Sequence, residues 1–322
     1  MSPFKHIGYK IARSLPAQFI VRRSKTTTLP GFRGIPIYDV VLFFIKQVQT
    51  VGLQERASSI AFNFVMAIPP SIIFLFTLIP FLPISRDFET QLYGLIRDVV
   101  PGQKDNSVLI SFLQDFINNP RNGLLSIGFI LSIFFSSNAI MGVMRSFDKN
   151  YIGFKKRTEL QKRLTALQIT FVLFVFVFAT ILLLVGQGQV LKVIGINSQW
   201  VRTAILNLRW LLIVVLLFAS ISFIYRHAPA VHKKWRMINP GSILATFLML
   251  VLTLGFSWWV SRFGNYNQLY GSIGTVLILM LMIYFNSMVL LIGFELNVSI
   301  SSLQKIAEER NNNLADGDGK PT

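Results

Sequence analysis

Six apolar stretches of bilayer length decide what this chain can fold into. An α-helix rises about 1.5 Å per residue, so roughly 20 apolar residues cross the hydrocarbon core of a membrane. The stretches are Ser58–Leu82, Leu124–Met144, Ala166–Gly186, Leu208–Tyr225, Ile238–Val260 and Gly274–Leu296. The core helices of a soluble domain would instead alternate apolar and polar faces. The sequence therefore predicts an all-α, polytopic membrane protein with six transmembrane helices and short amphipathic interfacial helices.

Basic residues are distributed unevenly among the connections between these stretches. The chain carries 31 Lys and Arg against 14 Asp and Glu, a net charge of +17. With six spans, 23 of the 31 basic residues fall on the side that holds both termini. Because positive residues are retained in the cytoplasm, we expect both termini to be cytoplasmic. The basic excess indicates anionic lipid headgroups as partners rather than nucleic acid, since no basic domain stands apart from the membrane.

The polarity of the chain divides it into three regions. They are a basic cytoplasmic N-terminal segment (1–36), a membrane domain (37–305) and a polar cytoplasmic tail expected to be disordered (306–322). A predicted helix over Tyr38–Leu53 lies either flat on the membrane surface or packed as a cap on the bundle. The external connection 83–123 carries two amphipathic stripes and is either a lid or an interfacial hairpin. Residues 266–274 are rich in turn-forming residues and predict a tight external turn.

Polar residues inside the apolar stretches are candidates for a substrate cavity. The first stretch holds Asn63 and the consecutive prolines Pro69 and Pro70, which remove two backbone donors and predict a bent or broken helix. A broken helix near the bilayer midplane often lines a substrate site. With Asn138 and Asn286, these residues form one candidate cavity. The alternative is that they serve only to shape the packing of the helices.

Glu295 is the one acidic residue within the six stretches, and it lies at the predicted cytoplasmic end of the last. An ionisable group within a span is costly and usually faces a partner, the bundle interior or water. Its candidate partners at the same level are Arg56, Arg145 and Arg226. Asp148 completes a predicted cluster of charges at this end. The cluster is either an ion pair that locks the helix ends or a functional site.

Five short motifs lie near the ends of the spans. They are Arg56–Phe62 followed by Ile68–Pro69, Arg145–Tyr151, Asn239–Gly241, Asn267–Gly274 and Gly293–Asn297. Together they cover about residues 40–305, in order, with the six spans in register. This ordered set resembles the BrkB/YihY family of bacterial inner-membrane proteins. The resemblance implies an inner-membrane location, and the family has carried the label ribonuclease BN.

The residues themselves do not favour a ribonuclease or another enzyme. RNA hydrolysis needs an acid and a base within hydrogen-bond reach, or a metal held by clustered carboxylates. The histidines His6, His227 and His232 have no metal-ligand spacing to acids. The chain also lacks cysteine and a Walker A motif. We therefore expect no metal, no cofactor and no catalytic residue.

The functional prediction is a transporter or flippase-like protein for an amphipathic or lipid-linked substrate. It rests on the near absence of a soluble domain, on the proline pair beside Asn63, and on the basic residues around Glu295. A membrane scaffold or envelope-integrity factor is the first alternative, and a membrane-bound hydrolase is the second. Movement of a substrate, its cleavage or neither distinguishes the three.

Overall fold

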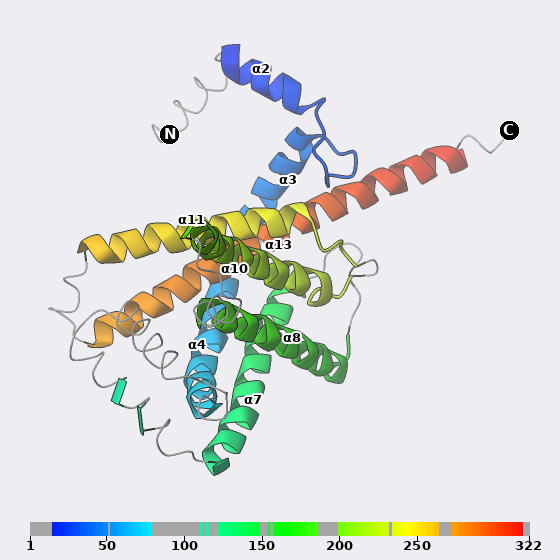
Figure 1. The fold of residues 1–322 in the computed structure, drawn as a ribbon. Coiled ribbons are helices and arrows are strands. Elements are labelled where there is room, and N and C mark those ends of the chain that lie inside the picture. The colour runs from blue at the N-terminus through cyan, green and yellow to red at the C-terminus, as the bar shows by residue number, and fades with distance from the viewer. Residues whose placement is uncertain are drawn as a thin grey trace.

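The protein is almost entirely helical wherever the structure describes it (Figure 1). The computed structural model describes residues 15–50, 52–78, 122–148, 157–185, 199–231, 234–263 and 272–317, with short pieces at 110–111, 114–115 and 154. Within these residues an isolated antiparallel bridge joins Phe154 to Val231, and no longer β-structure is present.

Six long helices dominate the described part of the chain. They are α4 (Leu53–Leu78), α7 (Asn122–Phe147), α8 (Glu159–Val185), α10 (Gln199–His227), α11 (Pro240–Phe263) and α13 (Ser272–Gly317). Each contains a stretch that is long and apolar enough to cross a membrane. Two shorter helices, α2 (Leu15–Ser24) and α3 (Ile37–Thr50), precede them. The predicted all-α fold with six transmembrane helices is confirmed.

The six long helices pack in chain order as a closed ring. Each of α4, α7, α8, α10 and α11 contacts the next long helix, and α13 returns to contact α4. The most extensive contact is between α4 and α7. In Figure 1 the α4–α7 pair and the α11–α13 pair run in different directions from the region where α4 meets α13.

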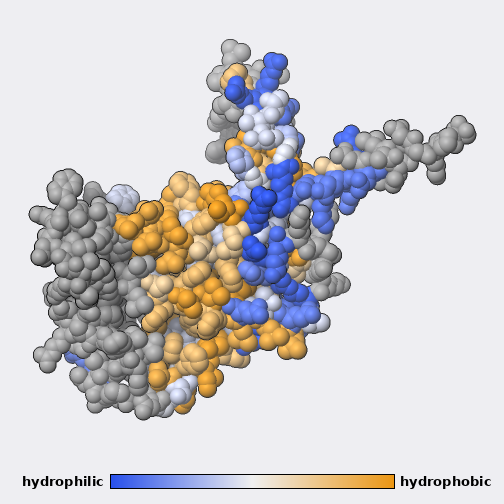
Figure 2. All heavy atoms as spheres, turned by 45° about the vertical axis from the view of Figure 1, so that its right-hand side comes forward, coloured by the Kyte–Doolittle hydropathy of each residue, from blue (hydrophilic) through white to orange (hydrophobic). Residues whose placement is uncertain are grey.

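The buried core lies at one end of this ring, which we call the packed end. It is built from residues of all six long helices and of the connection after α10, namely Leu53–Ile60 of α4, Ile140–Phe147 of α7, Ala166 and Ile169 of α8, Ile221–Tyr225 of α10, Ala245 of α11, Val289–Val298 of α13, and Ala228 and Trp235. On α13, Leu291 and Phe294 are buried, whereas Leu277 and Leu281 are exposed. Figure 2 shows apolar residues over the body of the visible face and hydrophilic residues gathered toward the C-terminal part of α13. Exposed apolar helices of this kind suit contact with lipid.

Helix α3 combines the two predicted placements of the 38–53 segment. Val40 is fully buried and packs with Phe32 and Ile300, so one face of α3 caps α13. On the rest of the helix, Val41 and Ile45 are exposed apolar residues. The bundle therefore holds α3 through one face, and the other apolar residues remain available to a membrane surface.

The predicted disordered tail is helical over most of its length. The structure continues α13 without interruption to Gly317, eleven residues beyond the start of the expected tail at residue 306. The reason is local, because residues 305–309 are good helix formers with no proline. Gln304 also donates to Glu308 one turn later at 2.8 Å. Likewise, Leu15–Ser24 within the basic N-terminal segment forms α2.

The expected break at the proline pair is also corrected by the structure. Helix α4 runs from Leu53 to Leu78 and passes through Pro69 and Pro70 as helix. A proline removes a donor and crowds the preceding turn, but a helix held by neighbours tolerates it. The lid or hairpin predicted for 83–123 lies almost entirely outside the described residues, as do residues 266–271 of the predicted turn. Helix α13 already begins at Ser272.

Candidate functional site

A buried ion pair joins two spans at the packed end. Arg56 lies in the first turn of α4, and its Nη1 donates to Oε1 of Glu295 in α13 at 2.6 Å. The Arg56 side chain is 8% exposed and that of Glu295 is 0% exposed. Arg56 Nη2 also donates to the backbone oxygen of Ser146, near the end of α7, at 2.5 Å. One guanidinium group therefore ties three helices together.

Aromatic side chains surround the residue that precedes the buried glutamate. The rings of Phe147 and Phe294 are stacked, with centroids 3.9 Å apart and an angle of 5° between their planes. Trp235 lies 5.7 Å from Phe294, and Phe154 meets Phe294 edge-on at 6.4 Å. Tyr225 lies 6.1 Å from Phe147. These rings exclude water from the packed end and strengthen the electrostatic interactions there.

Two glycines allow α11 and α13 to cross at very short range. A Cβ atom added at Gly293 would lie 2.6 Å from the carbonyl oxygen of Gly241, closer than real Cβ contacts. One turn farther along α13, Asn297 Oδ1 accepts from Gly241 N at 2.9 Å, and Asn297 Nδ2 donates to Asn239 Oδ1 at 2.7 Å. Asn239 in turn caps α11, because its Oδ1 accepts from Ser242 N at 2.8 Å. A side chain of α13 therefore completes the cap of α11.

The other members of the predicted charge cluster lie apart from this pair. Arg145 is exposed and Arg226 is partly buried, and no carboxylate in the described part of the chain forms an ion pair with either. Asp148 Oδ2 lies 3.4 Å from Lys162 Nζ in α8. Burial raises the pKa of the Asp148 carboxyl above its ordinary value, and the Lys162 charge opposes that shift.

The three asparagines predicted to line a cavity have separate partners. Asn63 donates to Ser59 O at 2.7 Å, and Asn286 donates to Met282 O at 2.9 Å, each within its own helix. Asn138 Oδ1 accepts from Arg163 Nη1 in α8 at 2.5 Å. No contact recorded among the described residues joins the three asparagines to one another.

The proline pair lies next to a polar seam between α4 and α7. Pro69 is exposed and Pro70 is partly buried. The hydroxyl of Ser71 lies 3.3 Å from those of both Ser132 and Ser136 on α7. Hydroxyl groups that bond across an interface favour close approach of two spans. The seam therefore supports the role in packing at least as directly as the role in a cavity.

Sequence reasoning missed Arg157, which holds the connection after α10. Its Nη1 donates to Ala228 O at 2.9 Å, and its Nη2 donates to His227 O at 3.3 Å and Pro229 O at 3.1 Å. Nothing in one sequence separates this arginine from the other basic residues of its connection. Asn239 and Asn297 were within the recognised motifs, but only the structure brings them together.

The arrangement is suited to holding helices rather than to acid–base chemistry. Among the residues that the structure describes, no group of three or more His, Asp or Glu side chains is placed to hold a metal ion. The buried charges of Arg56 and Glu295 face each other at 2.6 Å behind stacked rings. Such a site holds the ends of α4, α7 and α13 together.

Known proteins similar to this chain match it over most of its length. The family model described as Virulence factor BrkB matches residues 44–318. YfkH of Bacillus subtilis (strain 168), whose name describes it as ribonuclease-like, is 29% identical over 262 residues, covering 80% of this chain and 93% of that protein. A UPF0761 membrane protein of Haemophilus influenzae is 22% identical over 278 residues, covering 85% and 98%. No solved structure matches the chain.

Proposed function

The chain belongs to the BrkB virulence-factor family, and from this premise we propose that it is a flippase-like transporter for an amphipathic or lipid-linked substrate. In this proposal it is a multi-pass protein of the bacterial inner membrane, with both termini in the cytoplasm, and it is not an enzyme. The packed end then faces the cytoplasm, where its basic connections meet anionic lipid headgroups.

One observation carries the proposal, namely that α11 and α13 are packed at one end and less tightly packed toward the other. On the inward face of α11, Gly241 and Ala245 are buried, whereas Leu252 and Phe256 farther along this face are only partly buried. Helix α13 shows the same contrast along its length. A bundle that served only as a scaffold would be expected to bury a continuous seam along its helices. Closure at one end alone supports a path that opens to the outer half of the bilayer.

The packed end has the properties of a closed gate. The Arg56–Glu295 pair and the stack of Phe147 on Phe294 join α4, α7 and α13 at the same level. A substrate with an apolar part can lie against the exposed outer halves of the helices, and its polar part needs polar groups within the bundle. The hydroxyl groups of Ser71 and Ser136, which are only partly buried, offer such groups.

A lipid-translocation assay tests the proposal. The full chain is reconstituted in liposomes that contain a trace of phospholipid with a fluorescent headgroup label, and dithionite then destroys the label in the outer leaflet. Transport predicts a larger loss of fluorescence than in protein-free liposomes. Glu295→Gln is expected to change the rate by weakening the gate, whereas Gly255→Ala is the matched control because a Cβ at Gly255 meets open space.

The same vesicles separate the alternatives. Release of a water-soluble fragment from the labelled lipid would indicate a hydrolase. Equal fluorescence loss with and without protein, for lipids of several headgroups and for a lipid-linked saccharide, would contradict transport and favour a scaffold. A rate that is identical in Glu295→Gln and in the unaltered protein would remove the ion pair from the mechanism.

A further inference from the structure

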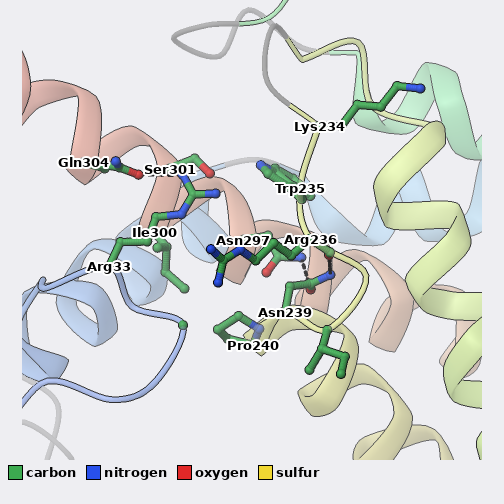
Figure 3. Close-up of a pocket in the computed structure, with 12 residues that line it drawn as sticks. Arg33, Lys234, Trp235, Arg236, Asn239, Pro240, Asn297, Ile300, Ser301 and Gln304 are labelled. Carbon is green, nitrogen blue, oxygen red and sulfur yellow. Dashed lines mark hydrogen bonds between the residues drawn. The ribbon is translucent and has the colours of Figure 1, made fainter.

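A pocket of about 470 Å³ lies beside the packed end, and Trp235, which packs on Phe294, forms part of its lining, whereas Arg56 and Glu295 do not. Three segments form it, namely the loop around Gly31 and Arg33, the segment 234–240, and one face of α13 between Asn297 and Gln304 (Figure 3). Its lining includes three basic residues and no acidic residue. The proposed function makes no use of this pocket.

The loop that carries Arg33 has an unusual backbone. Gly31 and Gly34 have φ values of 92° and 83°, and Arg33 between them has a φ of 54°. The left-handed region is unfavourable for a residue with a side chain and costs on the order of 1 kcal/mol or more. The surroundings hold the loop in this conformation, because Phe32 is buried against Val40 and Ile300. The backbone therefore directs Arg33 to the pocket at some energetic cost.

Positive charge converges on the pocket. Figure 3 shows the guanidinium groups of Arg33 and Arg236 reaching into it from different segments, whereas Lys234 points away. Arg33 Nη1 donates to Gln304 Oε1 at 2.5 Å. No carboxylate in the described part of the chain forms an ion pair with any of the three. Two cations facing one cavity repel each other unless an anion lies between them.

The amino-terminal end of α11 faces the same pocket. Asn239 and Pro240 line it, and α11 begins at Pro240. The first backbone donors of α11 are occupied by side chains, since Gly241 N donates to Asn297 and Ser242 N donates to Asn239. The helix therefore contributes its positive dipole rather than free N–H groups. The field of the helix end and the two guanidinium groups favour the same ligand, an anion.

An apolar stripe leads away from the mouth of the pocket. Ile238 lines the pocket and is 70% exposed. Exposed apolar residues then follow along α11 at intervals of three or four residues. They are Ile243, Phe247, Val251, Leu254 and Trp258. This spacing places them on one face of the helix, directed along the span from the charged pocket.

We propose that this pocket binds the phosphate group of an anionic phospholipid, with an acyl chain lying along the α11 stripe. A planar guanidinium group can donate two parallel hydrogen bonds to the oxygens of one phosphate group, whereas a lysine ammonium group acts as a point charge. Arg33 and Arg236 therefore suit a phosphodiester better than two lysines would. The apolar stripe identifies the ligand as a lipid rather than a soluble phosphate compound. The assignment is independent of transport, because a scaffold would present the same site.

Native mass spectrometry of the delipidated full chain in nonionic detergent tests this assignment. Dioleoyl phosphatidylglycerol is titrated, and dioleoylglycerol, which lacks the phosphate, and glycerol phosphate, which lacks the chains, are the comparison ligands. Arg33→Gln and Arg236→Gln are each expected to weaken binding of the phospholipid about tenfold, as for loss of one charge-assisted contact. Arg310→Gln is the matched control, since Arg310 is an exposed arginine on α13 outside the pocket.

The comparisons separate a lipid from a soluble phosphate and from simple surface attraction. Ile238→Ser should weaken phosphatidylglycerol and leave glycerol phosphate unaffected. If inorganic phosphate or glycerol phosphate displaces the lipid at similar concentration, the ligand is a soluble phosphate compound and the lipid assignment is wrong. Equal weakening by Arg310→Gln, or none by the two pocket variants, would overturn the site itself. Melting temperatures measured without lipid verify that the variants fold, and Arg236→Gln avoids the constrained loop.

Discussion

The ion pair between Arg56 and Glu295 should be strongly coupled, and a double-mutant cycle measures that coupling. Arg56→Met and Glu295→Leu remove one charge each while retaining apolar volume, and the double variant removes both. Each single change leaves the other charge buried, since the two side chains are 8% and 0% exposed. Leaving one buried charge without the other therefore destabilises the folded protein more than removing both charges does.

The structure sets the size of the effect. At 2.6 Å the attraction of two unit charges is about 6 kcal/mol for an effective dielectric constant of about 20. The free energy needed to remove both groups from water offsets most of this attraction. The ion pair therefore stabilises the protein little more than two apolar residues in its place would. Each single change should destabilise the protein by about 3–5 kcal/mol. The double variant should lose only about 1–3 kcal/mol, chiefly because the Ser146 carbonyl loses its donor.

Unfolding by SDS in mixed micelles, followed by tryptophan fluorescence, gives the four free energies of the cycle. The expected coupling energy is about 3 kcal/mol or more. Glu159→Gln is a matched control, because Glu159 pairs with Lys162 at 3.1 Å but is 78% exposed. That surface pair should contribute less than about 1 kcal/mol. If the two buried changes are additive within about 0.5 kcal/mol, the argument that the charges stabilise one another is refuted.

Three further predictions concern packing, protonation and topology. Gly293→Ala should destabilise the protein by about 1–3 kcal/mol or more, because the new methyl group would overlap the Tyr225 hydroxyl and α11. Gly255→Ala is the control, since its methyl group meets nothing, and it should be neutral or slightly stabilising. Thermal unfolding in detergent compares the two variants. Because burial raises the pKa of Asp148 above 3.8, the folded protein binds the proton more tightly, so stability attributable to this group falls as pH rises from about 4 through the folded pKa. Asp148→Asn should remove that slope from the melting temperature, and a slope of opposite sign in the unaltered protein would contradict the reasoning. Reporter fusions at Thr322 and in the connection between the first two spans should report cytoplasm and periplasm respectively, and a periplasmic signal at Thr322 would mean that the number of crossings is odd.

Some features of the site could be predicted and others could not, and Glu295 illustrates both. Its burial at the end of a span could be predicted from the sequence, because a charge within a membrane is costly and faces a partner or the bundle interior. The sequence did not predict that Glu295 pairs with Arg56 rather than with Arg145 or Arg226, because all three arginines lie at the same level along their helices. The packing of α13 against the start of α4 made that choice. The same holds for Arg33, whose role depends on a loop with φ of 54° that no spacing indicates.

The amino-acid sequence by itself determined the helical class and the number of spans. Each bilayer crossing requires a long apolar helix whose backbone bonds are all internal, so length and composition are sufficient to identify it. Only the tertiary structure decided that α4 passes through its proline pair and that Gly241 meets Gly293. These outcomes depend on which helices touch, and contacts between distant segments leave no periodic trace in either segment. The pocket beside α11 is the clearest case, since the loop around Arg33 lies more than 200 positions before its other two walls and the positive charge gathers only where the three meet.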